Sequence, residues 1–314
     1  MKEKPLCTII IATIGRPEYF GAALASVSAQ TYRPLNILIS DNAANPPIDR
    51  AEIQNWAPGA DVRLVRHNTR LTAVKHANFC LQEATGEFVF LMSDDDLIAP
   101  DYINTAMECM ETDSQVGVVI SQQTKIDESF FGPISRATIQ FKTLTGSNFV
   151  TQWAIENKMP NLLTTAPMLA RRLEILEHGG FPDYPDGSHS PNLLLFKLCL
   201  GVKVGVLDGG YYYRIYPMSS GLLTPWGLLL TATENYDRDL LELHQQGRIK
   251  KELIRALLLG NTRLLVARWR NIYRHWKGLG NKVTPVFDIA FRILRLGWLH
   301  GLGTVPKIHR YLDF

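Results

Sequence analysis

Three consecutive carboxylates, at Asp94, Asp95 and Asp96, directly follow a mostly apolar run that begins at Phe88. Two carboxylates about 4–7 Å apart repel each other by a few kcal/mol at an effective dielectric constant near 20. No basic residue follows for many positions, and a hard divalent cation would relieve the repulsion. Mg²⁺ and Mn²⁺ prefer oxygen ligands, typically one or two carboxylates together with the phosphates of a substrate. The run therefore predicts a site for Mn²⁺ or Mg²⁺ and a phosphate-bearing ligand.

The alternative interpretation of these carboxylates is a solvated turn that caps a helix beginning at Pro100. Acidic residues gather before helix starts, where they meet the positive end of the helix dipole. A cap accounts for Asp96 or Asp101, but it accounts poorly for three carboxylates in a row. We therefore favour the metal and phosphate site.

Strands and helices alternate along the first 120 residues, and this alternation decides where the carboxylates lie. The short, nearly continuous apolar runs are typical of a mainly parallel sheet that is covered on both faces. The expected strands are 6–13, 35–40, 62–67, 87–93 and 116–121, and the expected helices are 17–30, 72–86 (closed by Gly86) and 100–112. Ligands of such a sheet bind beyond the carboxyl ends of its strands. Those ends carry Thr13 to Arg16, Asp41, His67 and the three aspartates.

The pattern is looser in the second half of the chain. Residues 129–147 predict a long surface excursion with aromatic side chains, and 161–172 return to the core. A turn-rich loop at 178–191 precedes a buried helix at 193–200. Asp208-Gly209-Gly210 predicts the turn of a β-hairpin. From about residue 225 the sequence is helical.

Composition excludes several classes of protein. The 314 residues are 46% hydrophobic and 20% charged, as in an ordinary globular protein. The four cysteines stand singly, without the spacing of a metal site or a redox motif, which predicts reduced and mostly buried thiols in a cytoplasmic protein. No stretch reaches about 18 uncharged apolar residues, so we expect no transmembrane segment.

The helical end of the chain is basic, although the rest is not. Residues 242–314 hold 14 Lys and Arg against 4 Asp and Glu, whereas residues 1–241 hold 19 against 26. Within 249–303, apolar side chains recur at the spacing of a helix face, and most basic side chains lie elsewhere. Basic amphipathic helices with tryptophan suit an anionic membrane surface, and the alternative is a helix pair packed on the rest of the protein. Nucleic acid is not expected, because no binding motif accompanies the charge.

Four blocks of the sequence, in their order and spacing, resemble the family 2 glycosyltransferases of bacterial glycan biosynthesis, which have the GT-A fold. They are TIIIATIGRPEYFGAALASVSAQTY, NILISDNA, HNTRLTAVKHANFCLQEATGEFVFLMSDDDLIAPDYI and ILEHGGF. The resemblance covers residues 5–215. It implies an α/β catalytic domain at 1–222, with a nucleotide-binding half at 1–120 and an acceptor half at 121–222, followed by a basic amphipathic helical extension at 223–314.

The resemblance assigns roles to four residues around the strand ends. Thr13 would contact the nucleoside of the donor, with Arg16 close by, and Asp41 would hydrogen-bond the donor base. Lys75 stands where the family usually has an arginine near the base and phosphates. The plain alternatives are turn residues for the first three and a solvated helix charge for Lys75.

The same resemblance gives the aspartates their chemistry. Asp94 and Asp95 would face the ribose and the diphosphate, and Asp96 would bind the metal. The metal and Lys75 would stabilise the departing nucleoside diphosphate, where negative charge develops in the transition state. Family members invert the anomeric centre in one displacement. The implied activity is metal-dependent, inverting transfer of a hexosyl group from a nucleotide sugar to a glycan or lipid-linked acceptor. The expected donor is UDP-linked, and the enzyme is expected in the cytoplasm or on the inner face of the membrane.

One departure from the family concerns the general base, which would deprotonate the acceptor hydroxyl. The family's acidic pair falls on Ser190-Pro191, and neither residue can accept the proton. Asp183, Asp186 and His189 are the nearby candidates. We favour Asp186, since an irregular loop can shift it into place, and then His189, because a histidine is a competent base near pH 7. The alternative role of both residues is turn formation.

A second departure lies at Tyr216, which replaces a histidine that many relatives carry two residues after the position of Arg214. A phenol is a poorer neutral ligand than an imidazole, so metal binding would depend more on Asp96 and water.

Three other functions compete with glycosyl transfer. A nucleotidyltransferase should have a glycine-rich loop with Arg and Lys after the first strand, which ATIGRPEYF lacks. A phosphohydrolase with a nucleophilic aspartate would carry its acidic motif on the first strand and not on the fourth. The third is a catalytically weak donor-binding or scaffold subunit, which only the missing acidic pair supports.

Overall fold

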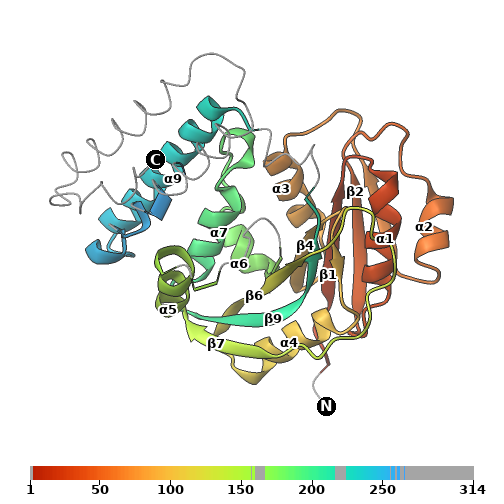
Figure 1. Cartoon of the computed structure of the whole chain (residues 1–314), viewed down its shortest axis with the longest axis horizontal. Coiled ribbons are helices and arrows are strands. Elements are labelled where there is room, and N and C mark those ends of the chain that lie inside the picture. The colour runs from red at the N-terminus through yellow and green to blue at the C-terminus, as the bar shows by residue number, and fades with distance from the viewer. Residues whose placement is uncertain are drawn as a thin grey trace.

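A single mixed β-sheet organises the computed structural model, which describes residues 3–156, 158–159, 167–215, 224–254, 256–258, 260–261 and 265 (Figure 1). The described strands follow the order β3-β2-β1-β4-β8-β6-β9-β5, with β7 paired to β9. They are β1 (Cys7–Thr13), β2 (Leu35–Asp41), β3 (Val62–Arg66), β4 (Phe88–Ser93), β5 (Leu97–Ile98), β6 (Val116–Lys125), β7 (Phe141–Thr145), β8 (Met168–Arg171) and β9 (Lys203–Tyr213). Strands β5, β7 and β8 pair antiparallel with their neighbours, and the other pairs are parallel. The mainly parallel α/β sheet that the sequence predicted is confirmed.

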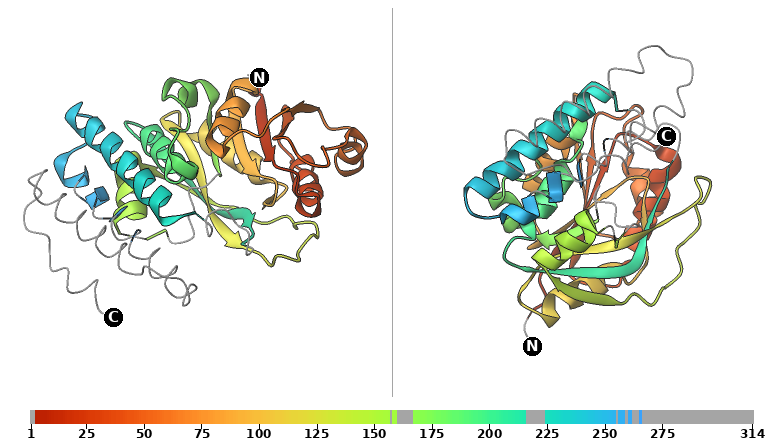
Figure 2. Two further views of the ribbon diagram at one scale, coloured as in Figure 1. Left: turned by 90° about the horizontal axis from the view of Figure 1, so that it is seen from above. Right: turned by 60° about the vertical axis from the view of Figure 1, so that its left-hand side comes forward.

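Helices cover both faces of this sheet (Figures 1 and 2). They are α1 (Pro17–Ser28), α2 (Arg50–Trp56), α3 (Ala73–Glu83), α4 (Tyr102–Thr112), α5 (Gly146–Val150), α6 (Arg172–Glu177), α7 (Ser190–Leu198) and α9 (Trp226–Gln245), with the π-helix η1 (Thr151–Ile155) and the 3-10 helix η2 (Pro185–Gly187). Side chains alternate between the two faces along a strand. Ile9 and Ile11 of β1 therefore join the cluster with α1 and α4, whereas Ile10 joins the cluster with α3, α7 and α9.

The described start of the C-terminal extension packs on the second half of the sheet. Tyr236 and Leu240 of α9 are buried in the same cluster as the leucines of α7, and Ile254 and Leu257 join them. Of the predicted apolar face, Leu257 and Leu265 are buried, Leu253 packs on this cluster, and Leu264, Trp269, Ile272 and Trp276 lie outside the described residues. The helix that the structure describes here follows the packing alternative. Membrane contact of 249–303 stays a prediction.

Among the described residues, no helix combines the length and the apolarity that crossing a membrane requires. The four cysteines are buried and free, as predicted.

The predicted end of the helix at 72–86 is wrong. Helix α3 ends at Glu83 with Ala84 as an extended cap, and Gly86 lies beyond it. A Cβ atom on Gly86 would stand 2.6 Å from the backbone nitrogen of Thr8. Glycine is needed here because two backbones approach closely, and not because a helix closes.

The predicted hairpin through Asp208-Gly209-Gly210 is also wrong, because β9 continues from Lys203 to Tyr213. Its two parts pair with β6 in the same direction, and the register shifts by a bulge after Ser121. Gly210 supplies the positive φ of 86° at this irregularity. Turn-forming residues thus make a bulge here, which bends the strand without reversing it.

Candidate functional site at the carboxyl edge of the sheet

The carboxyl ends of β1 and β4 form the point where the strand order reverses, since the chain builds β2 and β3 on one side of β1 and β4 on the other. This is the place where open α/β sheets bind ligands. Thr13 ends β1 opposite Asp41 at the end of β2, and Ala12 lies opposite Ser93 at the end of β4. The parallel register therefore brings the predicted residues of three strands to one edge.

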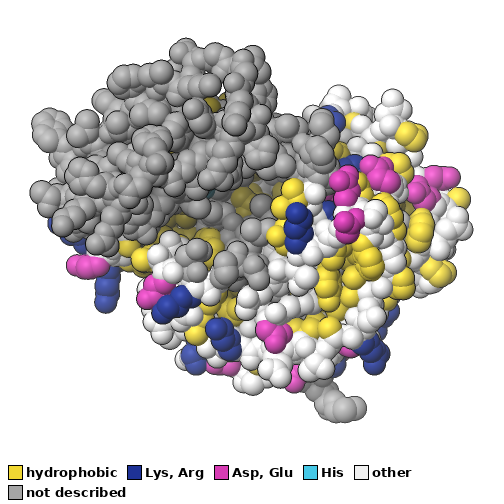
Figure 3. All heavy atoms as spheres, in the orientation of Figure 1, with side chains coloured by type: hydrophobic (Ala, Val, Ile, Leu, Met, Phe, Trp, Pro, Cys, Tyr) yellow, Lys and Arg dark blue, Asp and Glu magenta, His cyan; other side chains and the backbone are white. Residues whose placement is uncertain are grey.

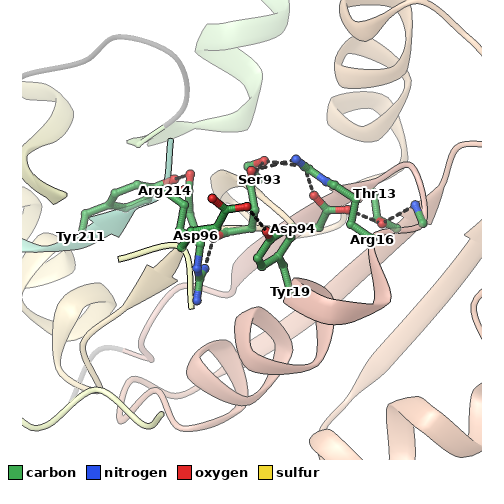
Figure 4. A network of polar contacts seen from close by, with 11 residues as sticks. Thr13, Arg16, Tyr19, Ser93, Asp94, Asp96, Tyr211 and Arg214 are labelled. Carbon is green, nitrogen blue, oxygen red and sulfur yellow. Dashed lines mark hydrogen bonds and ion pairs between the residues drawn. The ribbon is translucent and has the colours of Figure 1, made fainter. Parts of the chain in front are cut away.

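Asp94 is held between Thr13 and Arg16 (Figure 4). The Thr13 hydroxyl donates to Asp94 Oδ2 at 2.5 Å, and Arg16 Nη2 pairs with Asp94 Oδ1. Arg16 Nη1 also donates to Asp95 Oδ2 at 2.7 Å, so one guanidinium bridges two of the three carboxylates. Burial raises the pKa of Asp94, and Arg16 and Thr13 oppose that shift. The Arg16 guanidinium therefore offsets the negative charge of both Asp94 and Asp95.

A second arginine fixes the backbone of the run. Arg214, just beyond β9, donates from Nη1 to the main-chain oxygen of Asp95 and from Nη2 to that of Phe130. The side chain of Asp95 accepts further hydrogen bonds from Ser93 Oγ. The histidine position of the family pattern, Tyr216, lies outside the described residues.

Asp96 has a different environment from its neighbours. Its Oδ2 accepts a hydrogen bond of 2.6 Å from the hydroxyl of Tyr211 on β9. Burial, and then the charge of Asp95, raise the pKa of Asp96 to about 8, although Tyr211 and Arg214 favour its ionised form. Because the carboxylate is costly to keep charged here, a cation at this position would be strongly favoured.

The contacts of the three aspartates fit a metal ion that takes most of its ligands from the substrate. The oxygens of Asp94 and Asp95 are bound by Thr13, Arg16 and Ser93, whereas the Asp96 carboxylate accepts a hydrogen bond from Tyr211. Within the described residues, no group of three His, Cys, Asp or Glu side chains could hold a metal alone. Mg²⁺ and Mn²⁺ are commonly held by one or two carboxylates plus substrate phosphates and water, and Asp96 fits that role.

Asp41 is buried at the end of β2 and organises the next loop. Its Oδ1 accepts from the backbone nitrogen of Ala44 at 2.7 Å, and its Oδ2 accepts from that of Ile48 at 3.1 Å. Arg66 Nε approaches Oδ2 at 3.2 Å. A carboxylate offers about four acceptor sites, so these contacts leave capacity for a further donor.

Lys75 and Asp186 come from elements that meet beside this edge. Lys75 is exposed in the first turn of α3, which begins just after β3 ends. A Cβ atom on Gly187 would lie 3.4 Å from Val74 Cγ2, so η2 rests on the start of α3. Asp186 is exposed, has a φ of 56°, and its Oδ2 accepts a hydrogen bond from Thr224.

The turn before η2 is fastened to α3 by one side chain. Asn78 Nδ2 donates to the carbonyl of Phe181 at 2.8 Å, and its Oδ1 accepts from the Phe181 nitrogen at 2.9 Å. Gly180, at φ 66°, is required here because a Cβ atom would lie 2.5 Å from Asn78 Oδ1. The loop that carries the candidate bases is therefore held in place at its first end.

His189 is built into the fold more firmly than Asp186. It precedes α7 with a φ of 63°, its Nε2 lies 3.0 Å from Thr233 Oγ1, and its ring stacks on Tyr236 with centroids 5.2 Å apart. Thr233 already donates to the carbonyl of Leu229, so His189 Nε2 carries the proton of that contact. Ser190, the position of the family's acid, is buried at the start of α7.

Sequence reasoning brought Thr13, Arg16 and the aspartates together but missed their internal partners. Arg16 was expected near a nucleoside, and here it is the counter-ion of Asp94 and Asp95. Tyr211 was not singled out, although a tyrosine in a buried strand needs a partner for its hydroxyl. That rule was the available signal, but it does not say which carboxylate is the partner.

Comparison with known proteins places this geometry in context. The profile of the family described as "Glycosyl transferase family 2" matches residues 8–172, slightly more than half of the chain. A curated relative, the uncharacterized glycosyltransferase MJ1057 of Methanocaldococcus jannaschii, is 22% identical over 129 residues. This match covers 40% of the chain and 44% of the relative, so it spans less than half the length of that protein.

Solved structures share the fold at low sequence identity. TarS 1–349 of S. aureus, in complex with UDP-GlcNAc, has a TM-score of 0.57 and 14% identity, with 94% of this chain and 92% of that chain covered. A longer TarS chain has a TM-score of 0.56 at 14% identity, with 85% of this chain and 43% of that one covered. The mannosyltransferase PcManGT of Pyrobaculum calidifontis, with GDP-Man and Mn²⁺, has a TM-score of 0.53 and 17% identity, with 94% and 81% covered. The predicted GT-A fold is confirmed.

Proposed function

The chain belongs to glycosyl transferase family 2, and from this premise we propose that it is a metal-dependent, inverting glycosyltransferase. It moves a hexosyl group from a nucleotide-diphosphate sugar to a hydroxyl of a glycan or lipid-linked glycan. The observation that carries the proposal is the network of Thr13, Arg16, Asp94 and Asp95 beside Asp96, at the switch point of the sheet.

The donor is proposed to be a UDP-sugar. Asp41 retains acceptor capacity beside the loop that it organises, which suits the N–H group of a uracil ring. Thr13 would lie against the nucleoside, and Asp94 and Asp95 would face the ribose and diphosphate. Lys75 is exposed at the start of α3, within reach of a phosphate group for a long, flexible ammonium side chain. The UDP-GlcNAc complex of the similarly folded TarS supports a UDP-sugar, whereas PcManGT, which shares the fold, is in complex with GDP-Man.

Asp96 is the proposed metal ligand, with Mn²⁺ or Mg²⁺ as the ion. When bound, the ion would neutralise charge that develops on the departing diphosphate. The protein's part is to hold Asp96 in one orientation through Tyr211. The Mn²⁺ in the complex of PcManGT supports a divalent ion in a protein of this fold.

Asp186 is the proposed general base and His189 the second candidate. The acceptor oxygen would attack the anomeric carbon while the bond from that carbon to the diphosphate oxygen breaks, and the acceptor proton would pass to the base. Asp186 is the better candidate because it is exposed, whereas His189 binds Thr233 and stacks on Tyr236. Both residues have positive φ, an uncommon conformation that is often found at functional sites.

A thermal-shift screen of nucleotide sugars, with and without Mn²⁺, tests the donor proposal. One nucleotide should stabilise the protein, and Asp96→Ala should abolish the metal-dependent part of that stabilisation. Stabilisation by no nucleotide under either condition would contradict the proposal.

One observation favours a second candidate function, a donor-binding or scaffold subunit with weak activity. Ser190 replaces the usual acid and is buried, so no carboxylate stands at that position. Donor hydrolysis in the presence of Mn²⁺ separates the two functions, because a scaffold would bind the donor without cleaving it.

We propose that the chain is divided into three segments with different functions. Residues 1–120 carry the donor site, 121–222 carry the acceptor side, and 223–314 form the basic extension. This extension is proposed to bind the anionic inner face of the cytoplasmic membrane.

A further inference from the structure

Phe131 presents an exposed aromatic ring that the protein nevertheless holds in place. The residue is 48% exposed, on the loop between β6 and β7. Its ring stacks on Tyr19 of α1 with centroids 5.8 Å apart and an interplanar angle of 17°. The guanidinium carbon of Arg214 lies 5.6 Å from the centre of the Phe131 ring and 5.3 Å from that of Tyr19. One aromatic ring and one guanidinium thus restrain this exposed side chain.

The same arginine joins this ring to the aspartates. Arg214 is buried, and its two terminal nitrogens bind the main-chain oxygens of Asp95 and Phe130 (Figure 4 draws Arg214 as part of this network). The position of the Phe131 ring is therefore coupled to the backbone that carries Asp96.

Three further exposed apolar residues are sequence neighbours of residues in this network. Ile14 follows Thr13 directly, Ile215 follows Arg214, and Phe130 precedes Phe131, and each of them is exposed. Figure 3 shows hydrophobic side chains gathered on the part of this face that the loop between β6 and β7 crosses in Figure 1. The apolar surface thus borders the proposed donor site.

We propose that Phe131 is a stacking platform for a pyranose ring of the acceptor, an inference that rests on the proposed glycosyl transfer. The axial C–H bonds of a pyranose carry partial positive charge and pack against the negative face of an aromatic ring. A rigid ring also loses little conformational entropy on binding, because Arg214 and Tyr19 already restrain it. Arg214 thereby connects the ring that would bind the acceptor sugar to the aspartates of the proposed donor site.

The direct test is ¹⁹F NMR of protein labelled with 4-fluorophenylalanine, with UDP and Mn²⁺ present and the Phe131 signal assigned by Phe131→Leu. The probes are methyl glycosides of glucose, galactose, mannose and N-acetylglucosamine, up to about 100 mM, which reaches weak stacking interactions. At least one glycoside should shift the Phe131 signal in a saturable way. If none of them does, the platform is wrong.

Variants separate a sugar from an alkyl chain as the occupant. In UDP-release assays with the glycoside that shifts the signal, Phe131→Ala should raise the KM for glycoside about tenfold, and Phe131→Tyr should restore it. Phe131→Leu should behave like Phe131→Ala, because leucine keeps apolar bulk but not the flat face. Two results would overturn the proposal: a wild-type KM in Phe131→Leu, or full competition with the glycoside by an octyl compound that carries no sugar. Leu173→Ala is the control, since Leu173 is 63% exposed on α6, which packs on β8, α3 and α7.

The donor signal keeps this test separate from the proposed function. If UDP with Mn²⁺ gives no thermal shift and the donor is not hydrolysed, the glycosyltransferase proposal itself fails. If the donor binds and is hydrolysed but the Phe131 signal ignores every glycoside, only the platform fails.

Discussion

The hydroxyl of Tyr211 donates a hydrogen bond of 2.6 Å to Asp96 Oδ2. Tyr211 is fully buried and lies among Phe90 and Tyr102, whose ring centroids are each 6.2 Å away. The carboxylate that is proposed to bind a metal is therefore oriented by a side chain that cannot easily move. Partners of this kind set both the direction and the basicity of a metal ligand.

Tyr211→Phe should weaken Mn²⁺ binding while the fold is retained. Loss of the hydroxyl leaves one oxygen of a buried carboxylate unsatisfied and removes a contact that favours its charged form. We expect the activation constant for Mn²⁺ to rise about 10- to 100-fold, measured by metal titration of donor hydrolysis. Tyr102→Phe is the control, because it removes a similarly buried hydroxyl that binds Ser121 and not an aspartate. Equal effects of the two variants would show that Tyr211 acts through packing alone.

Arg16→Ala should destabilise the protein strongly, because it leaves the buried Asp94 without its counter-ion. Breaking a buried ion pair from one side costs about 3–5 kcal/mol, measurable by urea denaturation. Arg16→Gln combined with Asp94→Asn should recover part of that loss, since the buried charge of Asp94 is removed together with its counter-ion and only the more exposed Asp95 loses its Arg16 contact. In contrast, Arg63→Ala removes an exposed pair with Glu83 and should cost less than about 1 kcal/mol. An additive double mutant would refute the coupling of Arg16 to Asp94.

The stability of the metal-free protein should fall between pH 6.5 and 8.5 because of Asp96. Burial raises the pKa of this carboxyl from 3.8 to about 8, so the folded state binds a proton that the unfolded state has already lost. The contribution of this bound proton to the free energy of unfolding is complete below the pKa of Asp96 in the unfolded state. It shrinks as the pH rises above that value and is gone once the pH passes the pKa of the folded state. Over this window we expect a loss of about 1–2 kcal/mol, visible as a lower Tm.

Asp96→Asn provides the comparison for this pH dependence. Asparagine cannot titrate, so the difference between the wild-type and variant profiles isolates Asp96. Burial lowers the pKa of His76 to about 4, so its contribution to stability changes mainly below about pH 7 and is the same in both proteins. Parallel profiles of the two proteins would contradict the raised pKa.

The sequence predicted the edge of the site well because the relevant signals are local. Apolar runs of strand length ended on polar residues at Thr13, Asp41 and Asp94, and parallel pairing alone aligns such ends. The short helix α2 was missed because only Ile53 of its seven residues is buried, which leaves no periodic pattern to detect.

The partners of the aspartates were beyond sequence reasoning because they depend on tertiary distance. Arg16 lies 78 residues before Asp94, and Tyr211 lies 115 residues after Asp96. The hairpin error at Gly210 has a similar origin: a glycine with positive φ suits a turn or a bulge equally, and only the pairing of both flanks with β6 decides between them.

Asp186→Asn should lower glycosyl transfer by at least about 10²-fold with little loss of UDP binding, if Asp186 accepts the acceptor proton. His189→Asn is the rival test, and asparagine suits the positive φ of that position better than alanine does. Asp183→Asn tests the third candidate, because Asp183 is also an exposed carboxylate of the same loop. Transfer rates under single-turnover conditions measure the effect. If neither Asp186 nor His189 matters, the base lies elsewhere.

Vesicle flotation tests whether the basic extension at 223–314 binds an anionic membrane. Ile249, Ile254, Leu257 and Leu258 are buried in the core, so these side chains are not available to insert into a bilayer. Binding should therefore depend mainly on charge: the protein should float with vesicles that contain phosphatidylglycerol, and not with pure phosphatidylcholine. Raising the salt concentration to about 0.5 M should release it, because screening then acts within a few ångströms.

Replacing Arg270, Arg274 and Lys277 by glutamate should abolish flotation, whereas the same change at Arg50 and Arg63 of the catalytic domain should not. Flotation that survives the glutamate substitutions would assign the membrane contact to another surface, and no flotation with anionic vesicles would leave packing on the catalytic domain as the role of the extension.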